Sequence, residues 1–302
     1  ANVSSVTYLD GYFVWSITGS DQYVISAVLN AFAYAPLDFA AAESTPDDIE
    51  RVFTLHEELW LFGSQTIEVH VNTGAVTFPF QRQSGGTIDV GIRSRDAICE
   101  CDNSVFWVGN DLIVYRSEGY RPKRVSTHAI EQEMQTLAGS VYHMFALNFN
   151  GHQMVVLNMT SRTYVYDCAT ELWHQRCTTN IDDSWFPDCS LRYKNRMLVG
   201  GFGGGRILQL VASDATDDGL GHPQQIYMPP IWAETGLGFM HRLEVEVETG
   251  LNASEKFLSL EISDNSGTTW TTAVLKSMGT SGVHDKRVYW TRLGRFRQRL
   301  IR

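Results

Sequence analysis

The sequence predicts an all-β protein in which β-propeller-like repeats are followed by a small antiparallel β-sandwich. Short apolar or alternating runs, separated by Gly, Asn, Asp and Ser, recur along most of the chain. The apolar runs return with a period of about 46 residues, and the composition changes after His222-Pro223. With 302 residues, 43% of them hydrophobic and 19% charged, the chain can fill the core of one large or two ordinary domains.

Five apolar runs define the repeat, and their centres lie 43 to 49 residues apart. Each run is followed by a polar turn and a further apolar run, as expected for the four-stranded blade of a propeller. A coincidental spacing in another multi-sheet β protein remains the alternative. In chain order, the runs are Phe13-Val14-Trp15, Leu59-Trp60-Leu61, Val105-Phe106-Trp107, Met154-Val155-Val156 and Met197-Leu198-Val199.

Only two helical segments are expected. Thr45-Pro46-Asp47-Asp48 has the cap, first-turn proline and acidic residues of a brief helical turn. A short helix is predicted over residues 128–134, with Ser126 or Thr127 as its N-cap.

The region after residue 225 has a different pattern. Pro229-Pro230 marks a boundary, and in the segment 243–248 Leu and Val alternate with Glu, as in a strand with one buried face. We therefore expect a β-propeller domain over residues 1–225, whose N-terminal part this chain need not include. A C-terminal β-sandwich-like domain is expected over residues 226–302.

The charge is unevenly distributed. The net charge of -10 argues against a general nucleic-acid binder, yet residues 286–302 contain seven basic residues and no acidic one. Three arginines occupy alternate positions of the last predicted strand. In one hypothesis they pair with three glutamates of the segment 243–248, and in the other they face DNA. We favour cross-strand pairing. The residues concerned are Arg295, Arg297, Arg299, Glu244, Glu246 and Glu248.

Motifs for chemistry are weak. The segment 263–270 resembles an Asp-box, a hairpin turn of sialidase-like propellers, through Ser263, Asn265, Gly267 and Trp270. Residues 214–219 hint at a calcium loop but lack two ligands of the EF-hand pattern. No catalytic residues, cofactor site or metal site are predicted, and the five cysteines are expected to be small buried hydrophobes. No apolar run is long enough to serve as a membrane anchor.

The chain resembles a known family, the packaged-DNA stabilisation proteins, or tail hub proteins, of short-tailed bacteriophages. The resemblance runs from about Tyr34 to Arg302 and depends on a set of segments in a fixed order. These are residues 37–40, 42–44, 58–69, 72–74, 78–82, 103–107 and 126–131 and, most specifically, the segment Asp285-Lys286-Arg287-Val288-Tyr289-Trp290-Thr291-Arg292-Leu293-Gly294-Arg295. Family members are longer, so the chain is expected to be a fragment.

The resemblance implies a structural, non-enzymatic virion protein of the phage tail, assembled in the bacterial host cytoplasm. It would form a homo-oligomeric ring, expected to be a hexamer, under the portal or adaptor protein. The ring would stabilise packaged DNA, conduct double-stranded DNA during ejection without sequence-specific binding, and contact a tail needle or plug and tailspikes. The alternative is a carbohydrate-binding or sialidase-like propeller that acts in host receptor recognition. Candidate interface residues are Tyr120, Trp185, Phe186, Ile231 and Trp232.

Overall fold

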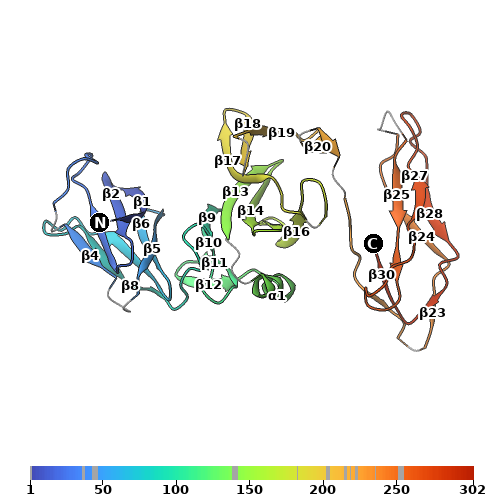
Figure 1. Ribbon diagram of the computed structural model, residues 1–302, viewed down its shortest axis with the longest axis horizontal. Helices are drawn as coiled ribbons and strands as arrows, with labels where there is room; N and C mark the ends of the chain where they lie inside the picture. The colour runs from blue at the N-terminus through green and yellow to red at the C-terminus, as the bar shows by residue number, and fades with distance from the viewer. Residues whose placement is uncertain are drawn as a thin grey trace. The chain divides into compact units, whose positions relative to one another are not determined.

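The computed structural model describes residues 2–35, 38–42, 47–137, 142–181, 183–201, 205–213, 216–217, 219–221, 224–234, 236–250 and 255–302. These ranges form antiparallel strands and one α-helix, which confirms the predicted all-β class (Figure 1). The chain folds into two compact units, unit 1 (Ala1–Pro223) and unit 2 (Gln224–Arg302).

The described part of unit 1 contains five antiparallel sheets, in each of which neighbouring strands are consecutive in sequence. The fifth sheet has three strands, the others have four, and a two-stranded ribbon follows. The strands are β1 (Val3–Leu9), β2 (Tyr12–Ile17), β3 (Gln22–Ile25) and β4 (Phe39–Ala41); β5 (Ile49–Leu55), β6 (Glu58–Gly63), β7 (Ile67–Asn72) and β8 (Phe80–Ile88); β9 (Ile98–Cys101), β10 (Ser104–Val108), β11 (Val114–Glu118) and β12 (Arg121–Arg124); β13 (His143–Phe149), β14 (His152–Asn158), β15 (Thr163–Asp167) and β16 (Leu172–Arg176); β17 (Pro187–Tyr193), β18 (Arg196–Gly201) and β19 (Ile207–Leu210); and the ribbon β20 (Thr216–Asp217) and β21 (Leu220–Gly221).

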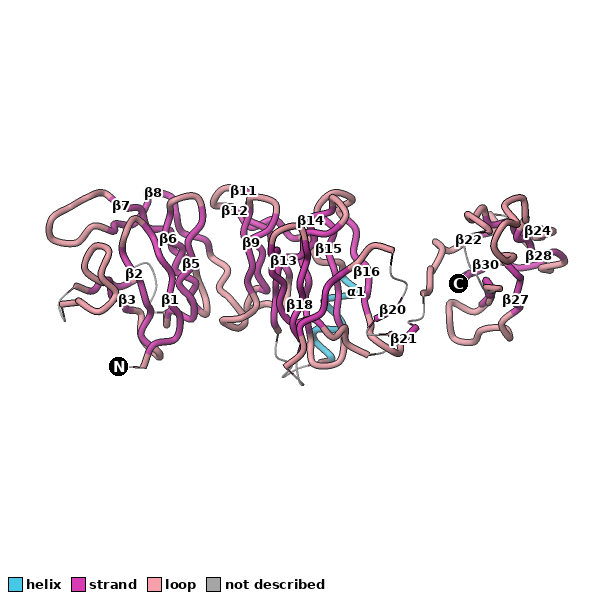
Figure 2. Tube along the Cα trace, turned by 90° about the horizontal axis from the view of Figure 1, so that it is seen from above, coloured by secondary structure: helices cyan, strands magenta, loops and turns pink. Residues whose placement is uncertain are grey.

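The five apolar runs of the sequence repeat all fall on the second strand of a sheet: β2, β6, β10, β14 and β18. Each repeat is therefore one sheet, as predicted. The longest step, between β10 and β14, contains the helix α1 (His128–Thr136). Figure 2 shows the first two sheets at one end of unit 1, followed by the third and then the fourth sheet.

The second strands of the three middle sheets, β6, β10 and β14, bury both faces, since successive side chains point to opposite sides of a sheet. In β6, Leu59 and Leu61 join an apolar cluster with the first sheet. Trp60 and Phe62 join a second cluster with the third sheet. The same division occurs in β10 and β14, so four apolar clusters lie between the five sheets. Sheet stacking thus explains why the strands contain continuous apolar runs.

The first strands of successive sheets also make polar contacts. The Ser5 Oγ of β1 accepts a hydrogen bond from the Val52 N–H of β5 at 2.8 Å. The hydroxyls of Thr7 and Thr54, on the same two strands, lie 2.8 Å apart. These bonds fix how β1 lies against β5 and leave few unpaired polar groups at the sheet interface.

The predicted helix is confirmed as α1, and Thr127 occupies its N-cap position. Neither proposed hydroxyl caps it, however: Thr127 makes no side-chain cap bond, and Ser126 Oγ donates to Glu131 at 2.6 Å instead. Ile130 and Met134 pack into the cluster between the third and fourth sheets. The helix is therefore an insertion that contributes to an inter-sheet core.

The helical turn expected at residues 45–48 falls partly outside the described residues, which exclude 45 and 46. Asp47 is buried, and the structure assigns it no helix. Its carboxylate accepts hydrogen bonds from the N–H groups of Ser64, Gln65 and Thr66 at 3.0, 2.6 and 2.9 Å. A Cβ at Gly63 would lie 2.3 Å from Asp47 Oδ2, so the turn between β6 and β7 requires glycine there.

Unit 2 consists of short sheets in which most paired strands lie about 40 to 70 residues apart, with β25 and β27 as a closer pair. Its pairs are β22 with β30, β26 with β30, β23 with β29, β24 with β28, and β25 with β27. One apolar cluster, which includes Leu260, Ile262, Trp290 and Ile301, forms its core. The strands are β22 (Ile231–Trp232), β23 (Gly238–Phe239), β24 (Arg242–Val245), β25 (Phe257–Leu260), β26 (Ile262–Ser263), β27 (Val274–Ser277), β28 (Val288–Thr291), β29 (Arg295–Phe296) and β30 (Gln298–Ile301).

Candidate functional site

The predicted cross-strand charge pairing in unit 2 is wrong. The glutamates Glu244, Glu246 and Glu248 are exposed as expected, but β24 pairs with β28, and Glu244 lies opposite Tyr289. The arginine-bearing strands β29 and β30 pair with β23, β22 and β26 instead. Charge complementarity did not identify the partner because many strand orders satisfy it equally well.

The three arginines do not share one face. Arg295 and Arg297 are exposed, whereas Arg299 is 2% exposed. Arg299 Nε and Nη2 donate to the two carboxylate oxygens of Asp264, each at 2.8 Å, and Nη1 donates to the Leu293 carbonyl at 2.7 Å. This bidentate ion pair ties β30 to the loop after β26. Arg299 is therefore a structural residue, and contact of Arg295 or Arg297 with DNA stays the untested alternative hypothesis.

The Asp-box-like segment forms a hydrogen-bonded turn. The Ser263 Oγ accepts from the Gly267 N–H at 2.9 Å, and Asn265 Oδ1 accepts from the Thr269 N–H at 2.9 Å. Asn265 Nδ2 also donates to Thr269 Oγ1 at 2.8 Å, so the amide occupies the place of the expected acid. The guanidinium of Arg302 lies over the Trp270 ring, 4.3 Å from its centroid. All four predicted residues thus have contacts that hold a turn or the sandwich together.

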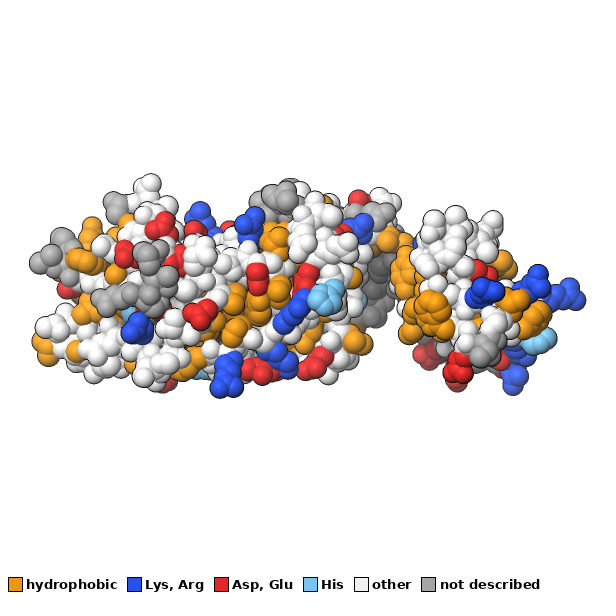
Figure 3. Space-filling view, turned by 90° about the horizontal axis from the view of Figure 1, so that it is seen from below, with side chains coloured by type: hydrophobic (Ala, Val, Ile, Leu, Met, Phe, Trp, Pro, Cys, Tyr) orange, Lys and Arg blue, Asp and Glu red, His pale blue; other side chains and the backbone are white. Residues whose placement is uncertain are grey.

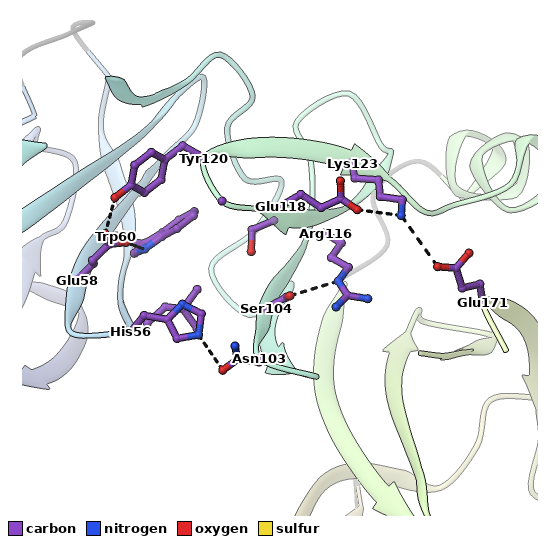
Figure 4. Close-up of a pocket in the computed structure, with 13 residues that line it drawn as sticks. His56, Glu58, Trp60, Asn103, Ser104, Arg116, Glu118, Tyr120, Lys123 and Glu171 are labelled. Carbon is purple, nitrogen blue, oxygen red and sulfur yellow. Dashed lines mark hydrogen bonds and ion pairs between the residues drawn. The ribbon is translucent and has the colours of Figure 1, made fainter. Parts of the chain in front are cut away.

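A polar cavity of about 590 Å³ lies at the edge of the second and third sheets, beside the hairpin that follows β15 (Figure 4). Sequence analysis did not predict it, because its walls come from three different repeats. Its lining residues are Leu55, His56, Glu58, Trp60, Asn103, Ser104, Arg116, Ser117, Glu118, Gly119, Tyr120, Lys123 and Glu171.

The polar groups of this cavity bind one another. Glu58 accepts hydrogen bonds from the Tyr120 hydroxyl and, at 3.2 Å, from the Trp60 indole N–H. Lys123 Nζ lies 2.8 Å from Glu118 and 4.0 Å from Glu171. The hydrogen bond to Glu58, together with partial burial, raises the pKa of Tyr120 to about 12. The phenol therefore stays protonated near neutral pH and cannot act as a base there.

The hydrogen bond from Lys123 lowers the pKa of Glu118. This carboxylate is consequently ionised at neutral pH, which does not suit a general acid. Arg116 is similarly engaged, with Nε donating to Ser104 Oγ at 3.2 Å and Nη2 lying 2.8 Å from Asp102. The arrangement fits a set of paired polar side chains between sheets better than it fits an active site.

The candidate apolar and aromatic interface residues divide between core and surface. Trp185 is buried between the fourth and fifth sheets, and Ile231 packs against the core of unit 2. Tyr120 lines the polar cavity, and the ring of Phe186 lies under the guanidinium of Arg206 at 5.1 Å. Trp232, with 65% of its surface exposed, remains available for contact.

Asp214 and Asp218 of the weak calcium motif lie outside the described residues. Asp217 accepts a hydrogen bond from the Trp185 indole N–H at 3.2 Å. Among the described residues, no group of three or more His, Cys, Asp or Glu side chains could hold a metal ion. Within the ranges that the structure describes, no helix is long and apolar enough to cross a membrane.

Charges are mixed on the visible surface. On the face shown in Figure 3, acidic and basic side chains of unit 1 are interspersed and form no continuous basic stripe. The most basic strand, β12, is compensated: Lys123 pairs with Glu118, and Arg124 pairs with Glu131. This pattern, with a net charge of -10, does not favour tight binding of a polyanion.

Family models match both parts of the chain. Residues 1–212 match the model described as "Bacteriophage P22 Gp10, beta-propeller", and residues 223–301 match "Bacteriophage P22 Gp10, beta-sandwich". The chain belongs to the bacteriophage P22 Gp10 family. The predicted order of a propeller followed by a sandwich is thereby confirmed, as is the resemblance to phage tail hub proteins.

A curated member of the Gp10 family is the tail hub protein gp10 of Salmonella phage P22, which is 24% identical over 316 aligned positions. The alignment covers 98% of this chain and 66% of that relative, so the chain spans just under two thirds of its length.

Solved structures give weaker similarities. KlHsv2 with loop 6CD replaced by a Gly-Ser linker has a TM-score of 0.33 and 10% identity, over 57% of this chain and 56% of that chain. The extracellular domain of a hybrid two-component system from B. thetaiotaomicron has a TM-score of 0.23 and 9% identity, over 97% and 52%. Similarities at this level carry no argument about fold or function.

Proposed function

We propose that this chain is a structural, non-enzymatic component of the tail hub of a short-tailed phage virion. The observation that carries the proposal is the match to both Gp10 modules in the same order. The name of the relative in phage P22 supplies the role. The mutually bound polar groups of the cavity in unit 1 support a role without catalysis.

Within that role, the chain forms a homo-oligomeric ring, a hexamer, below the portal or adaptor protein. Needle or plug and tailspike proteins are its other partners, and assembly takes place in the host cytoplasm. The build of unit 1 supports this: close-packed apolar clusters between successive sheets make a stiff module. Such modules can present fixed surfaces to neighbours related by rotational symmetry.

The ring stabilises packaged DNA and lets double-stranded DNA pass during ejection. A channel for DNA must not bind it tightly, and the net charge of -10 disfavours close contact with the DNA phosphates. Basic side chains that remain exposed, such as Arg295 and Arg297, would supply brief, salt-sensitive contacts.

The test is mass determination of the chain alone and with portal, adaptor and tail partners from the same phage. We expect a complex whose mass corresponds to a ring only when partners are present, and weak DNA binding that disappears as salt is raised. A chain that stays monomeric and never joins a tail complex would overturn the proposal. A reproducible glycan-array signal from such a monomer would replace it with the carbohydrate-binding alternative.

A further inference from the structure

Two cysteines face each other across the interface between the third and fourth sheets of unit 1. Cys101 ends β9, and Cys168 follows directly after β15. Their Sγ atoms are 3.9 Å apart, and both side chains belong to or pack against the same apolar cluster. The contact joins residues far apart in sequence and on different sheets.

We propose that Cys101 and Cys168 form an oxidisable dithiol whose disulfide would fasten the third sheet to the fourth. A disulfide has an S–S length of about 2 Å, so the sulfurs must approach by roughly 2 Å. Cys168 lies in the β15–β16 turn and is partly exposed, so its side chain is the one that can rotate. Cys101 is buried, and its Sγ lies 3.6 Å from the Met154 carbonyl, which is the alternative acceptor for its single S–H proton.

The environment distinguishes the two thiols. The hydrogen bond from Cys101 lowers the pKa of Cys168, and the positive charge of Arg116 acts in the same direction while burial opposes it. The same hydrogen bond and burial raise the pKa of Cys101. Cys168 is therefore the attacking thiol and Cys101 the resolving one, because the thiolate is the nucleophile in exchange.

The oxidant is a small soluble disulfide, such as oxidised glutathione. The Cys168 thiolate attacks one of its sulfurs, its S–S bond breaks, and one reduced thiol leaves. Cys101 then loses its proton to solvent and attacks Cys168 Sγ, which releases the second reduced thiol. The protein loses two hydrogens and two electrons, and one small disulfide becomes two thiols, so atoms and electrons balance.

The other cysteines provide contrasts. Cys99 is buried two residues before Cys101 on the same strand, where a pair is poorly placed to bridge. Cys189 is exposed, and its Sγ lies 3.8 Å from the Gly200 carbonyl. Cys189 should therefore accept glutathione as a mixed disulfide, and its Sγ makes no described contact with a second cysteine, which makes it the matched control.

The experiment uses the full chain, incubated with oxidised glutathione, alkylated and mapped by peptide mass spectrometry without reduction. We expect a cross-linked pair of peptides that contains Cys101 and Cys168 and is lighter by two hydrogens, and a glutathione adduct at Cys189. A persistent glutathione adduct at Cys168, or unreacted Cys168 in a sample where Cys189 has reacted, would overturn the proposal.

Variants add a second readout. Cys168→Ser should abolish the cross-link, and Cys189→Ser should leave it intact. The cross-link should raise the Tm by about 5 °C in the parent chain and in Cys189→Ser, reversibly with a reducing agent. An unchanged or lower Tm after complete cross-linking would show that the bond does not fit the native interface and would overturn the proposal. None of these outcomes depends on the proposed tail hub role.

Discussion

Units 1 and 2 are both built from short antiparallel strands, but they pair those strands in opposite ways. Within each sheet of unit 1, paired strands are consecutive in sequence, and apolar clusters lie between the sheets. In unit 2, β30 pairs with β22 and β26, so strands about 40 to 70 residues apart meet around a single cluster. The first unit thus depends on local pairing and stacking, whereas the second depends on long-range pairing.

The difference shows where stability must come from. A sheet in the middle of unit 1 is covered on both faces, so neighbouring residues of one strand both contribute to a core. A sheet of unit 2 has one covered face, and its long-range pairing is reinforced by the buried pair of Arg299 with Asp264. The following substitutions test this contrast in order of decreasing expected effect.

The largest effect should come from truncating buried residues on both faces of β6. Leu61→Ala and Phe62→Ala should each lower the free energy of unfolding by about 3–4 kcal/mol, because both side chains are fully buried in different clusters. On β28, Trp290→Ala should cost as much, but Tyr289→Ala, with 41% of Tyr289 exposed, should cost below about 1 kcal/mol. Denaturant titration measures all four, and a small loss for Leu61→Ala would show that β6 is covered on one face only.

The next effect tests the long-range ion pair. Arg299→Ala should cost about 3 kcal/mol, because it removes a bidentate partner of Asp264 and leaves the Leu293 carbonyl unpaired. The matched control is Arg295→Ala, whose exposed side chain should change stability by less than about 0.5 kcal/mol. Hydrogen exchange should place the loss in unit 2. Equal effects of the two substitutions would contradict the structural role of Arg299.

A smaller, pH-dependent effect is expected at the helix inserted in unit 1. Burial acts to raise the pKa of Glu131, but the hydrogen bonds from Arg124 and Ser126 outweigh it and lower the pKa below its ordinary value. The folded state therefore binds this proton more weakly than the unfolded state, and the stabilisation is lost as the pH falls below the ordinary value for glutamate.

Glu131→Gln should consequently cost about 1–2 kcal/mol near neutral pH, and the difference from the parent chain should shrink toward about pH 3. Thermal unfolding at several pH values measures this difference. Glu100→Gln, at an exposed position of β9, is the control and should show no such trend. Parallel pH profiles for Glu131→Gln and the parent chain would contradict the assignment.

The smallest effect should come from the Asp-box-like turn of unit 2. Asn265→Ala removes the acceptor of the Thr269 N–H and should cost about 1 kcal/mol. Asn265→Asp keeps that acceptor and should stay within about 0.5 kcal/mol of the parent. Chemical denaturation of both variants measures this, and a loss for Asp as large as that for Ala would show that the amide donor is the essential group.

The repeat and the fold class could be predicted because they depend on local patterns. The continuous apolar run of β6 indicates that both of its faces are buried, and recurrence every 43 to 49 residues reveals the sheets. The wrong prediction about Arg299 has a local cause. Strand β29 ends at Phe296 and β30 begins at Gln298, and this break changes the alternation so that Arg299 points inward while Arg295 and Arg297 stay exposed.

Other features could not be predicted because their residues come from different repeats. The polar cavity combines hairpins of three sheets, and the contact of Cys101 with Cys168 crosses two. Period and alternation determine the position of a residue within its own sheet, but they do not determine which loop residues of neighbouring sheets meet. Asp47 shows a further difficulty, since its local sequence resembled a helix start while its real partners are the amides of 64–66.

The pairing of β30 also affects how the protein is made. On the ribosome, each sheet of unit 1 can form as soon as its own strands have emerged, because its strand partners are adjacent in the nascent chain. Strands β22 and β26 must wait for residues 298–301 before their edges are paired and Arg299 reaches Asp264. During that interval the apolar side chains of unit 2 are exposed and can bind chaperones or other nascent chains. Slow synthesis of this segment would therefore increase the risk of aggregation during translation.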